Sequence, residues 1–296
     1  MGQATLIHHN PPTRPHPTCA VLYVHGWTDY FYNPELARFF TNAGAQFYAV
    51  DMRGIGRSLR PGHIPGFVTD LSSYFIDLDT ATSFIQQVHP GLPIVVVAHS
   101  QGALTVLLWA RQRRTTAAGL VLNSPWLGMP LSAAWRLGVT PVVKAMGRRW
   151  PQAVLPVASP RLYERTISAD FGGEWPINDQ WRANTHRPAR LGWAKAVLEA
   201  HAQIARGLNL TVPILTLTSH ASLIRPWWDE RMTQVDVITD VRTTWHHAPK
   251  LSTHHRVVRI RGGVHDVFLS PYRIRRQAHA EVAAWLAEEG FIPPHH

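Results

Sequence analysis

The sequence predicts an α/β fold in which helices cover both faces of a mostly parallel sheet. Short apolar runs rich in β-branched residues recur along the 296 residues, and helical stretches separate them. This alternation is the pattern of crossover units on a parallel sheet. A hydrophobic content of 45 % suffices for a substantial core at this length, so we expect a folded globular protein.

Six runs have the length and composition of strands, and they occupy residues 19–24, 46–50, 94–98, 119–123, 214–219 and 256–260. The N-terminal region leaves room for one further strand, near residues 4–8. Helices are expected between these runs, at residues 33–42, 101–113 and 278–288. The first of them carries Leu36, Phe39 and Phe40 on one face and is closed by Gly44.

One interval does not fit this alternation. About eighty residues, from Leu127 to Leu208, separate two consecutive strands, far more than a crossover needs. We expect residues 128–208 to form an inserted helical cap, which ends in an amphipathic stretch at 191–208, on a core made of residues 1–127 and 209–296. Six of the twelve tryptophans lie in or at the entrance of this interval, namely Trp126, Trp135, Trp150, Trp175, Trp181 and Trp193. These aromatics either line an apolar pocket under the cap or pack the small core of the cap itself.

The segment PIVVVAHSQG, residues 93–102, carries the clearest chemical signal. An apolar strand runs directly into Ala98-His99-Ser100-Gln101-Gly102 and then into a helix, which is the pattern of a nucleophile elbow with alanine in the first small position. Small residues are needed two before and two after the serine because the turn is very sharp. The turn lifts the Ser100 hydroxyl out of the sheet, and the helix N-terminus behind it stabilises negative charge.

A second motif, Val24-His25-Gly26-Trp27, ends the strand at 19–24. Such a His-Gly pair commonly forms part of an oxyanion hole, so we expect the backbone N–H groups of Trp27 and Gln101 to point at one substrate oxygen. Each such donor contributes roughly 3 kcal/mol of transition-state stabilisation. The segment 51–58, DMRGIGRS, lacks the third glycine of a dinucleotide loop and is interpreted as a structural turn.

A serine hydroxyl needs a base to remove its proton, and eighteen histidines are available. Nucleophile, acid and histidine follow in this chain order after an elbow, and the histidine lies in the loop after the last strand. His265 fits, because it follows the strand at 256–260 and the pair Gly262-Gly263, and precedes the final helix. Four other histidines precede that strand and are interpreted as surface residues: His246, His247, His254 and His255.

The acid should follow the strand at 214–219, because Ser-Pro-Trp after Asn123 offers no carboxylate. The carboxylates in the following loop are Asp229, Glu230, Asp236 and Asp240. We select Asp236, with Asp240 as the main alternative, since the loop is too long for spacing to decide.

Composition narrows the remaining function classes. Cys19 is the only cysteine, so no intrachain disulfide or cysteine-based zinc site can form, and the His-His pairs lack an HExxH arrangement, so we expect no metal and no cofactor. The net charge of +10 favours anionic partners, including peripheral contact with an anionic membrane, but the arginines form no nucleic-acid-binding pattern. With neither an export signal nor a membrane-length apolar run in view, we expect a cytoplasmic protein.

The assembled motifs resemble the monoglyceride lipase and lysophospholipase group of α/β hydrolases, which is described together with serine aminopeptidases. The resemblance rests on HGWTDYF, DMRGIGRS, AHSQG, VDVITD and GGVHDVFLS. It implies an α/β-hydrolase fold in which the insertion is a lid over the substrate. In that group a second carboxylate or a proline commonly follows the acid by four residues, which favours Asp236 over Asp240.

We therefore expect a serine hydrolase that cleaves carboxylic esters through a Ser100-His265-Asp236 triad and an acyl-enzyme. An aromatic cap favours an apolar acyl chain, as in a monoacylglycerol, a lysophospholipid or a simple ester. Two alternatives stay open: a non-catalytic small-molecule-binding protein on the same fold, and an aminopeptidase-type amide hydrolase. Against the second, no acidic cluster near the motifs is evident to hold a substrate amine.

Overall fold

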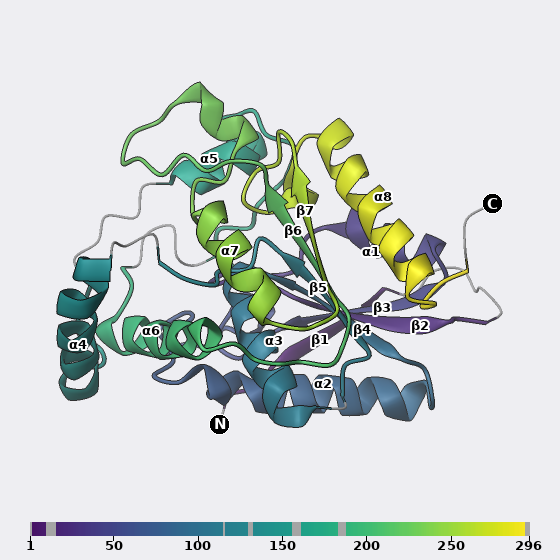
Figure 1. Cartoon of the computed structure of the whole chain (residues 1–296), viewed down its shortest axis with the longest axis horizontal. Coiled ribbons are helices and arrows are strands. Elements are labelled where there is room, and N and C mark those ends of the chain that lie inside the picture. The colour runs from purple at the N-terminus through teal and green to yellow at the C-terminus, as the bar shows by residue number, and fades with distance from the viewer. Residues whose placement is uncertain are drawn as a thin grey trace.

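The computed structural model describes residues 2–9, 16–114, 116–129, 133–155, 161–182 and 188–293 (Figure 1). Within these ranges, the strands form one sheet of seven in the order β1-β3-β2-β4-β5-β6-β7. Strand β1 runs antiparallel to β3, and all other neighbours are parallel. The strands are β1 (Thr5–His9), β2 (Cys19–Val24), β3 (Ala45–Asp51), β4 (Ile94–His99), β5 (Gly119–Asn123), β6 (Ile214–Ser219) and β7 (His255–Ile260).

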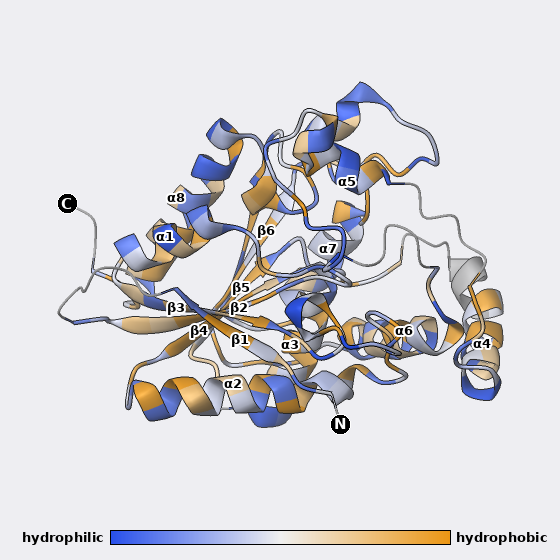
Figure 2. Ribbon diagram, turned by 180° about the vertical axis from the view of Figure 1, so that it is seen from behind, coloured by the Kyte–Doolittle hydropathy of each residue, from blue (hydrophilic) through white to orange (hydrophobic). Residues whose placement is uncertain are grey.

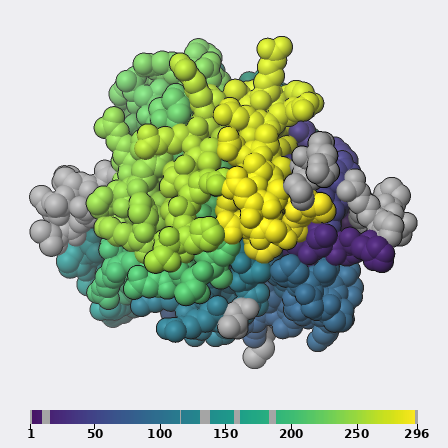
Figure 3. All heavy atoms as spheres, turned by 45° about the vertical axis from the view of Figure 1, so that its right-hand side comes forward, coloured from purple at the N-terminus to yellow at the C-terminus, as the bar shows by residue number. Residues whose placement is uncertain are grey.

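Helices pack on both faces of the sheet. The described helices are α1 (Pro34–Asn42), α2 (Phe75–Val88), α3 (Ser100–Arg113), α4 (Ala133–Arg149), α5 (Leu162–Ile167), α6 (Leu191–Ala205), α7 (Val241–His247) and α8 (Tyr272–Glu288). Short 3₁₀ turns lie at Gly56–Ser58, Leu71–Tyr74, Ala169–Phe171, Glu230–Gln234, Ala248–Lys250 and Val267–Leu269. Helix α8 lies at the molecular surface, where Figure 3 shows it in yellow. No helix among the described residues is both long and apolar enough to cross a bilayer.

Alternation along the strands explains the two layers of core. Val21 and Tyr23 of β2 face the cluster that includes α1 and α8, whereas Leu22 and Val24 face the cluster formed with α2, α3 and α6. Successive strand side chains point to opposite faces, so a strand covered on both sides is apolar throughout. Figure 2 shows this as hydrophobic colour along the central strands, whereas the helices show both hydrophobic and hydrophilic colour.

The predicted strands and helices are confirmed, with small differences at their ends. The expected N-terminal strand is β1, displaced by one residue from 4–8. The last helix begins at Tyr272 instead of residue 278. Its first turn is polar, and Arg275 is buried there through ion pairs with Glu35 and Glu174, so the apolar periodicity that marks a helix is absent from that turn.

The interval between β5 and β6 holds α4, α5 and α6. Helix α6 packs against α3, and α4 packs on α6 away from the sheet (Figure 1). The segment around α5 lies elsewhere, where Ile167 and Trp175 pack against Val264 and Leu269 beside the last strand. Of the six tryptophans at issue, Trp150 is exposed, and the side chain of Trp135 lies outside the described residues.

Candidate active site

The elbow forms at the junction of β4 and α3. Ser100 is the first residue of α3 and has a φ of 52°, a left-handed conformation that a non-glycine residue adopts at a cost of about 1–3 kcal/mol. Gly102 must be glycine, because a Cβ at this position would lie 2.2 Å from the carbonyl oxygen of His25. Ala98 is fully buried in β4, so its methyl group fits where the motif usually has glycine.

The loop after β7 brings His265 to the serine. The Nε2 atom of His265 lies 2.9 Å from the Ser100 Oγ atom, although the residues are 165 positions apart in the sequence. Gly262, with a φ of 76°, starts the turn that leads from β7 into this loop. The imidazole is buried, with 2 % exposure.

Asp236 lies on the other side of the imidazole, with 2.8 Å between its Oδ2 atom and His265 Nδ1. Oδ1 accepts hydrogen bonds from the N–H groups of Ile238 and Thr239, and Oδ2 also accepts one from the Thr239 hydroxyl. Burial raises the pKa of Asp236, but the attraction of His265 and these hydrogen bonds outweigh it, so the net effect lowers the pKa. The carboxylate therefore stays ionised and accepts a hydrogen bond from Nδ1–H, which leaves Nε2 free to accept the serine proton.

The other candidate acids and histidines lie elsewhere. Asp240 caps α7 by accepting a hydrogen bond from Arg242 N–H. Asp229 is paired with Arg231 in an exposed turn. His255 belongs to β7, where its ring contacts the Thr216 hydroxyl. In the described part of the chain, no three His, Cys, Asp or Glu side chains are close enough to hold a metal ion.

The His-Gly-Trp loop lies beside Ser100. The His25 ring is buried, where Nε2 accepts a hydrogen bond from Met52 N–H and Nδ1 donates one to the Gly26 carbonyl. His25 therefore holds the loop in place and does not face substrate. Trp27 lines the pocket above the serine, and Gln101 follows Ser100 in the first turn of α3. It remains a prediction that the backbone N–H groups of Trp27 and Gln101 form an oxyanion hole.

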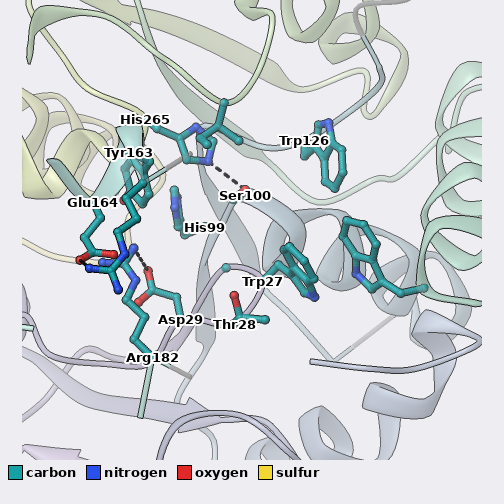
Figure 4. Close-up of a pocket in the computed structure, with 14 residues that line it drawn as sticks. Trp27, Thr28, Asp29, His99, Ser100, Trp126, Tyr163, Glu164, Arg182 and His265 are labelled. Carbon is teal, nitrogen blue, oxygen red and sulfur yellow. Dashed lines mark hydrogen bonds and ion pairs between the residues drawn. The ribbon is translucent and has the colours of Figure 1, made fainter. Parts of the chain in front are cut away.

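A cavity of about 250 Å³ opens over Ser100 and His265 (Figure 4). One end is aromatic and is lined by Trp27, Trp126 and Trp193. The Trp27 and Trp193 rings stack with centroids 4.1 Å apart, and Trp126 lies 5.8 Å from Trp193. Two tryptophans from in or beside the insertion thus line the pocket. Trp175 packs against Val264 and Leu269 of the core, which is neither of the two uses expected for these aromatics.

The opposite end of the cavity is polar, and we call Asp29, Tyr163, Glu164 and Arg182 the polar end (Figure 4). Asp29, Glu164 and Arg182 are each at least nine-tenths buried. An Arg182 nitrogen lies 3.8 Å from Asp29 Oδ2, and Arg161 lies equally far from Glu164. Arg182 Nη1, Glu164 Oε2 and the Tyr163 hydroxyl have no hydrogen-bond partner among the described residues.

This polar end was not predicted from the sequence. Two carboxylates, Asp29 and Glu164, line the pocket, and each lies 3.8 Å from an arginine nitrogen, so cations balance the acidic groups there. Asp29 follows the His-Gly-Trp motif directly, which is a signal that could have found it. Glu164 and Arg182 carry no such signal, since they come from the long interval between β5 and β6.

Comparison with known proteins identifies the family of this chain. The family model described as "Serine aminopeptidase, S33" matches residues 15–269. The chain belongs to this family. The predicted resemblance to the monoglyceride lipase-like group of α/β hydrolases is thereby confirmed.

Several relatives of this S33 family member are lipases. Monoacylglycerol lipase of Mycolicibacterium smegmatis is 27 % identical over 68 % of this chain and 69 % of its own length. Human monoglyceride lipase is 27 % identical over 63 % of this chain and 59 % of its own length. The aligned regions thus span about two thirds or less of these relatives. Together with the family, they identify the chain as an enzyme, a carboxylic ester hydrolase.

Solved structures confirm the fold. The crystal structure of Paleococcus ferrophilus monoacylglycerol lipase superposes with a TM-score of 0.69 and 19 % identity, covering 97 % of this chain and 99 % of that one. The structure of a soluble variant of Saccharomyces cerevisiae monoglyceride lipase gives a TM-score of 0.70 at 16 % identity, and the superposition covers 97 % of this chain and 91 % of that one. The predicted α/β-hydrolase fold is thereby confirmed.

Proposed function

We propose that this S33 family member hydrolyses esters between an apolar acyl chain and a small polyol such as glycerol, with Ser100 as nucleophile. The observation that carries the proposal is the continuous hydrogen-bonded path from Ser100 through His265 to Asp236 at the wall of one pocket. A Ser-His-Asp set in this geometry activates a hydroxyl for attack on a carbonyl.

The reaction follows from the positions of these groups. His265 Nε2 takes the Ser100 proton while Oγ bonds to the ester carbonyl carbon, and the N–H groups of Trp27 and Gln101 bind the resulting oxyanion. The intermediate then expels the alcohol, which receives the proton from His265, and an acyl-serine remains. Water repeats the sequence with the same base, releasing the fatty acid and restoring the Ser100 hydroxyl.

The two ends of the cavity support the substrate assignment. The tryptophans offer apolar surface to an acyl chain. At the polar end, Asp29 and Glu164 are balanced by Arg182 and Arg161, so the charges favour neither an anion nor a cation. The free donor and acceptor atoms there match hydroxyl groups, which donate and accept together. Relatives named monoacylglycerol lipase agree with this choice.

We also propose that residues 128–208 act as a cap over the site. Tyr163, Glu164, Arg182 and Trp193 come from this interval and line the pocket, while the catalytic residues come from the strand ends of the core. This division supports a role for the insertion in substrate recognition, while the proposed chemistry belongs to the core.

An aminopeptidase-type reaction is the second candidate, because the unpartnered Glu164 Oε2 could accept a substrate amine. Assaying amino-acid p-nitroanilides beside monoacylglycerols separates the two proposals. Turnover of the anilides that exceeds turnover of the glycerol esters, and that falls in Glu164→Gln, would favour the amine.

The direct test uses p-nitrophenyl esters from acetate to palmitate, 1-monoacylglycerols, and the Ser100→Ala variant. We expect wild type to hydrolyse them, with monoacylglycerol preferred over the methyl ester of the same acid, and Ser100→Ala to lose activity to background. Ligand binding with no Ser100-dependent hydrolysis would instead indicate the non-catalytic binding protein.

Peripheral contact with an anionic membrane stays a prediction. Val142, Met146 and Trp150 are exposed, one helical turn apart, along α4 and its end, and Arg148 and Arg149 lie in its last turn. An apolar stripe with flanking cations suits an anionic interface. Cosedimentation with phosphatidylglycerol vesicles, but not with phosphatidylcholine vesicles, is the expected result, and equal recovery with both would contradict it.

A further inference from the structure

One side chain of the insertion contacts both residues assigned to the oxyanion hole. Trp193 Nε1 donates a hydrogen bond of 2.7 Å to Gln101 Oε1, and the Trp193 ring stacks on Trp27 with centroids 4.1 Å apart and planes 21° from parallel. Trp193 lies in the first turn of α6, near the end of the interval between β5 and β6. No other reason for Gln101 to carry an amide is visible, since its Nε2 atom has no partner among the described residues.

The hydrogen bond fixes the Gln101 side chain. An indole N–H can only donate, so it selects the orientation in which the amide oxygen faces Trp193. Gln101 is 1 % exposed and Trp193 is 7 % exposed, so water competes little for this bond. The backbone N–H of Gln101 belongs to the same residue, and restraint of the side chain restrains the turn that carries it.

Trp27 is restrained from two directions. Its ring packs on Trp193, and its Nε1 donates to the Gly66 carbonyl 3.1 Å away. Gly66 has a φ of 62°, and a Cβ there would lie 2.8 Å from Trp27 Nε1, so the loop after β3 approaches this ring closely. Loss of the Trp193 ring would leave Trp27 held from one side.

We propose that Trp193 is a positioning residue that holds both donors of the oxyanion hole and thereby couples the cap to transition-state stabilisation. The inference rests on the proposed function, since it needs Ser100 to form an oxyanion. Donors stabilise that anion only when they are already directed at it, and a displacement of about 1 Å costs on the order of 100-fold in rate. The alternative is that Trp193 only contacts the acyl chain as part of the pocket wall. A positioning role affects kcat, whereas a wall role affects KM.

The experiment compares wild type, Trp193→Phe, Gln101→Met and the double variant on one p-nitrophenyl ester. Trp193→Phe keeps an aromatic ring on Trp27 but removes the N–H donor, and Gln101→Met removes the acceptor at similar volume. The matched control is Trp109→Phe, on the same helix α3 as Gln101, because it also loses one indole hydrogen bond, to Asp79, away from the pocket. Circular dichroism and thermal melting check that each variant is folded.

Either single variant should lower kcat about tenfold and change KM less than about twofold, and the double variant should lose no more than the worse single variant. Affinity for a trifluoromethyl ketone, whose adduct places an oxyanion in the hole, should weaken by the same factor as kcat/KM. Binding of the ether analogue, which lacks the carbonyl, should be unchanged. Trp109→Phe should keep the wild-type kcat once corrected for folded protein.

Failures of the two proposals are distinguishable. If Ser100→Ala is inactive but Trp193→Phe keeps the wild-type kcat, or raises only KM, Trp193 is a wall and the inference is wrong. Additive losses in the double variant would also contradict it, because the two groups would then not act through one hydrogen bond. If Ser100→Ala is as active as wild type, the proposed function fails and the inference fails with it.

Discussion

The proposed catalytic set, Ser100, His265 and Asp236, and the polar end of the pocket differ in how completely their polar atoms are hydrogen-bonded. Asp236 accepts four hydrogen bonds, and His265 has a partner on each ring nitrogen. At the polar end, Glu164 and Tyr163 each keep a buried oxygen without a partner among the described residues. The polar atoms compared are buried in both groups, so the depth of burial alone does not explain the difference.

The difference matches the roles proposed for the two groups, catalysis for the triad and substrate recognition for the polar end. A fully hydrogen-bonded catalytic set is held in its working geometry before substrate arrives. Buried polar groups without partners destabilise the free protein by about 1–3 kcal/mol each, and a ligand that completes their bonds recovers this free energy on binding. We therefore expect substitutions in the first group to change kcat and substitutions in the second to change selectivity.

The largest expected effect is on kcat, for a substitution in the fully hydrogen-bonded catalytic set. Asp236→Asn keeps the shape but donates where Asp236 accepts, so it favours the wrong imidazole tautomer, and we expect kcat to fall by a factor on the order of 10⁴ with little change in KM. Asp240→Asn is the matched control, because asparagine caps helix α7 as well as aspartate. Equal losses in both variants, measured with a p-nitrophenyl ester, would contradict the assignment of Asp236.

A smaller effect, on substrate selectivity, is expected for a substitution at the polar end. Tyr163→Phe removes the unpartnered hydroxyl and leaves the ring that packs at 86° on His265. We expect the ratio of kcat/KM for a monoacylglycerol to that for the methyl ester of the same acid to fall about threefold to tenfold, with stability unchanged or raised. Tyr74→Phe, which removes another buried unpartnered hydroxyl outside the pocket, should match it in stability and leave the ratio unchanged. An unchanged ratio in Tyr163→Phe would show that this hydroxyl of the polar end does not take part in substrate recognition.

The smallest effect is on stability, at a buried histidine that belongs to neither the catalytic set nor the polar end. Burial lowers the pKa of His279 to about 4, and its ring lies between Phe39 and Phe268. The unfolded chain binds this proton below pH 6.5 while the folded protein does not, so stability falls as the pH drops from about 6.5 to 4. His279→Phe should flatten this dependence by up to about 1.4 kcal/mol per pH unit in urea unfolding, with no change in slope above pH 7. An unaltered slope at acidic pH would show that His279 is protonated when folded.

The same contrast explains how much could be predicted from the sequence. Ser100, His265 and Asp236 follow the strands β4, β7 and β6, and the carboxyl ends of parallel strands meet at one edge of the sheet. The elbow motif and the chain order were therefore enough to predict Ser100 and His265. For the acid, the length of the loop left both Asp236 and Asp240 open, and only the family resemblance favoured Asp236. In the structure Asp236 contacts the imidazole of His265, whereas Asp240 caps helix α7.

The polar end could not be predicted in this way. Glu164 and Arg182 reach the pocket because Trp175 donates a hydrogen bond to the Leu269 carbonyl and Glu174 pairs with Arg275, which attach their segment to the core. These contacts join residues about a hundred positions apart and follow from packing, not from periodicity. The boundaries of the cap at 128 and 208 remain a prediction.

The most direct test of the central claim, that His265 activates Ser100, is covalent labelling with a fluorophosphonate followed by peptide mass spectrometry. The account predicts one adduct on the Ser100 peptide of the wild-type protein, none in Ser100→Ala, and labelling slower by orders of magnitude in His265→Ala. Labelling of His265→Ala at the wild-type rate, or an adduct on a different residue, would contradict it.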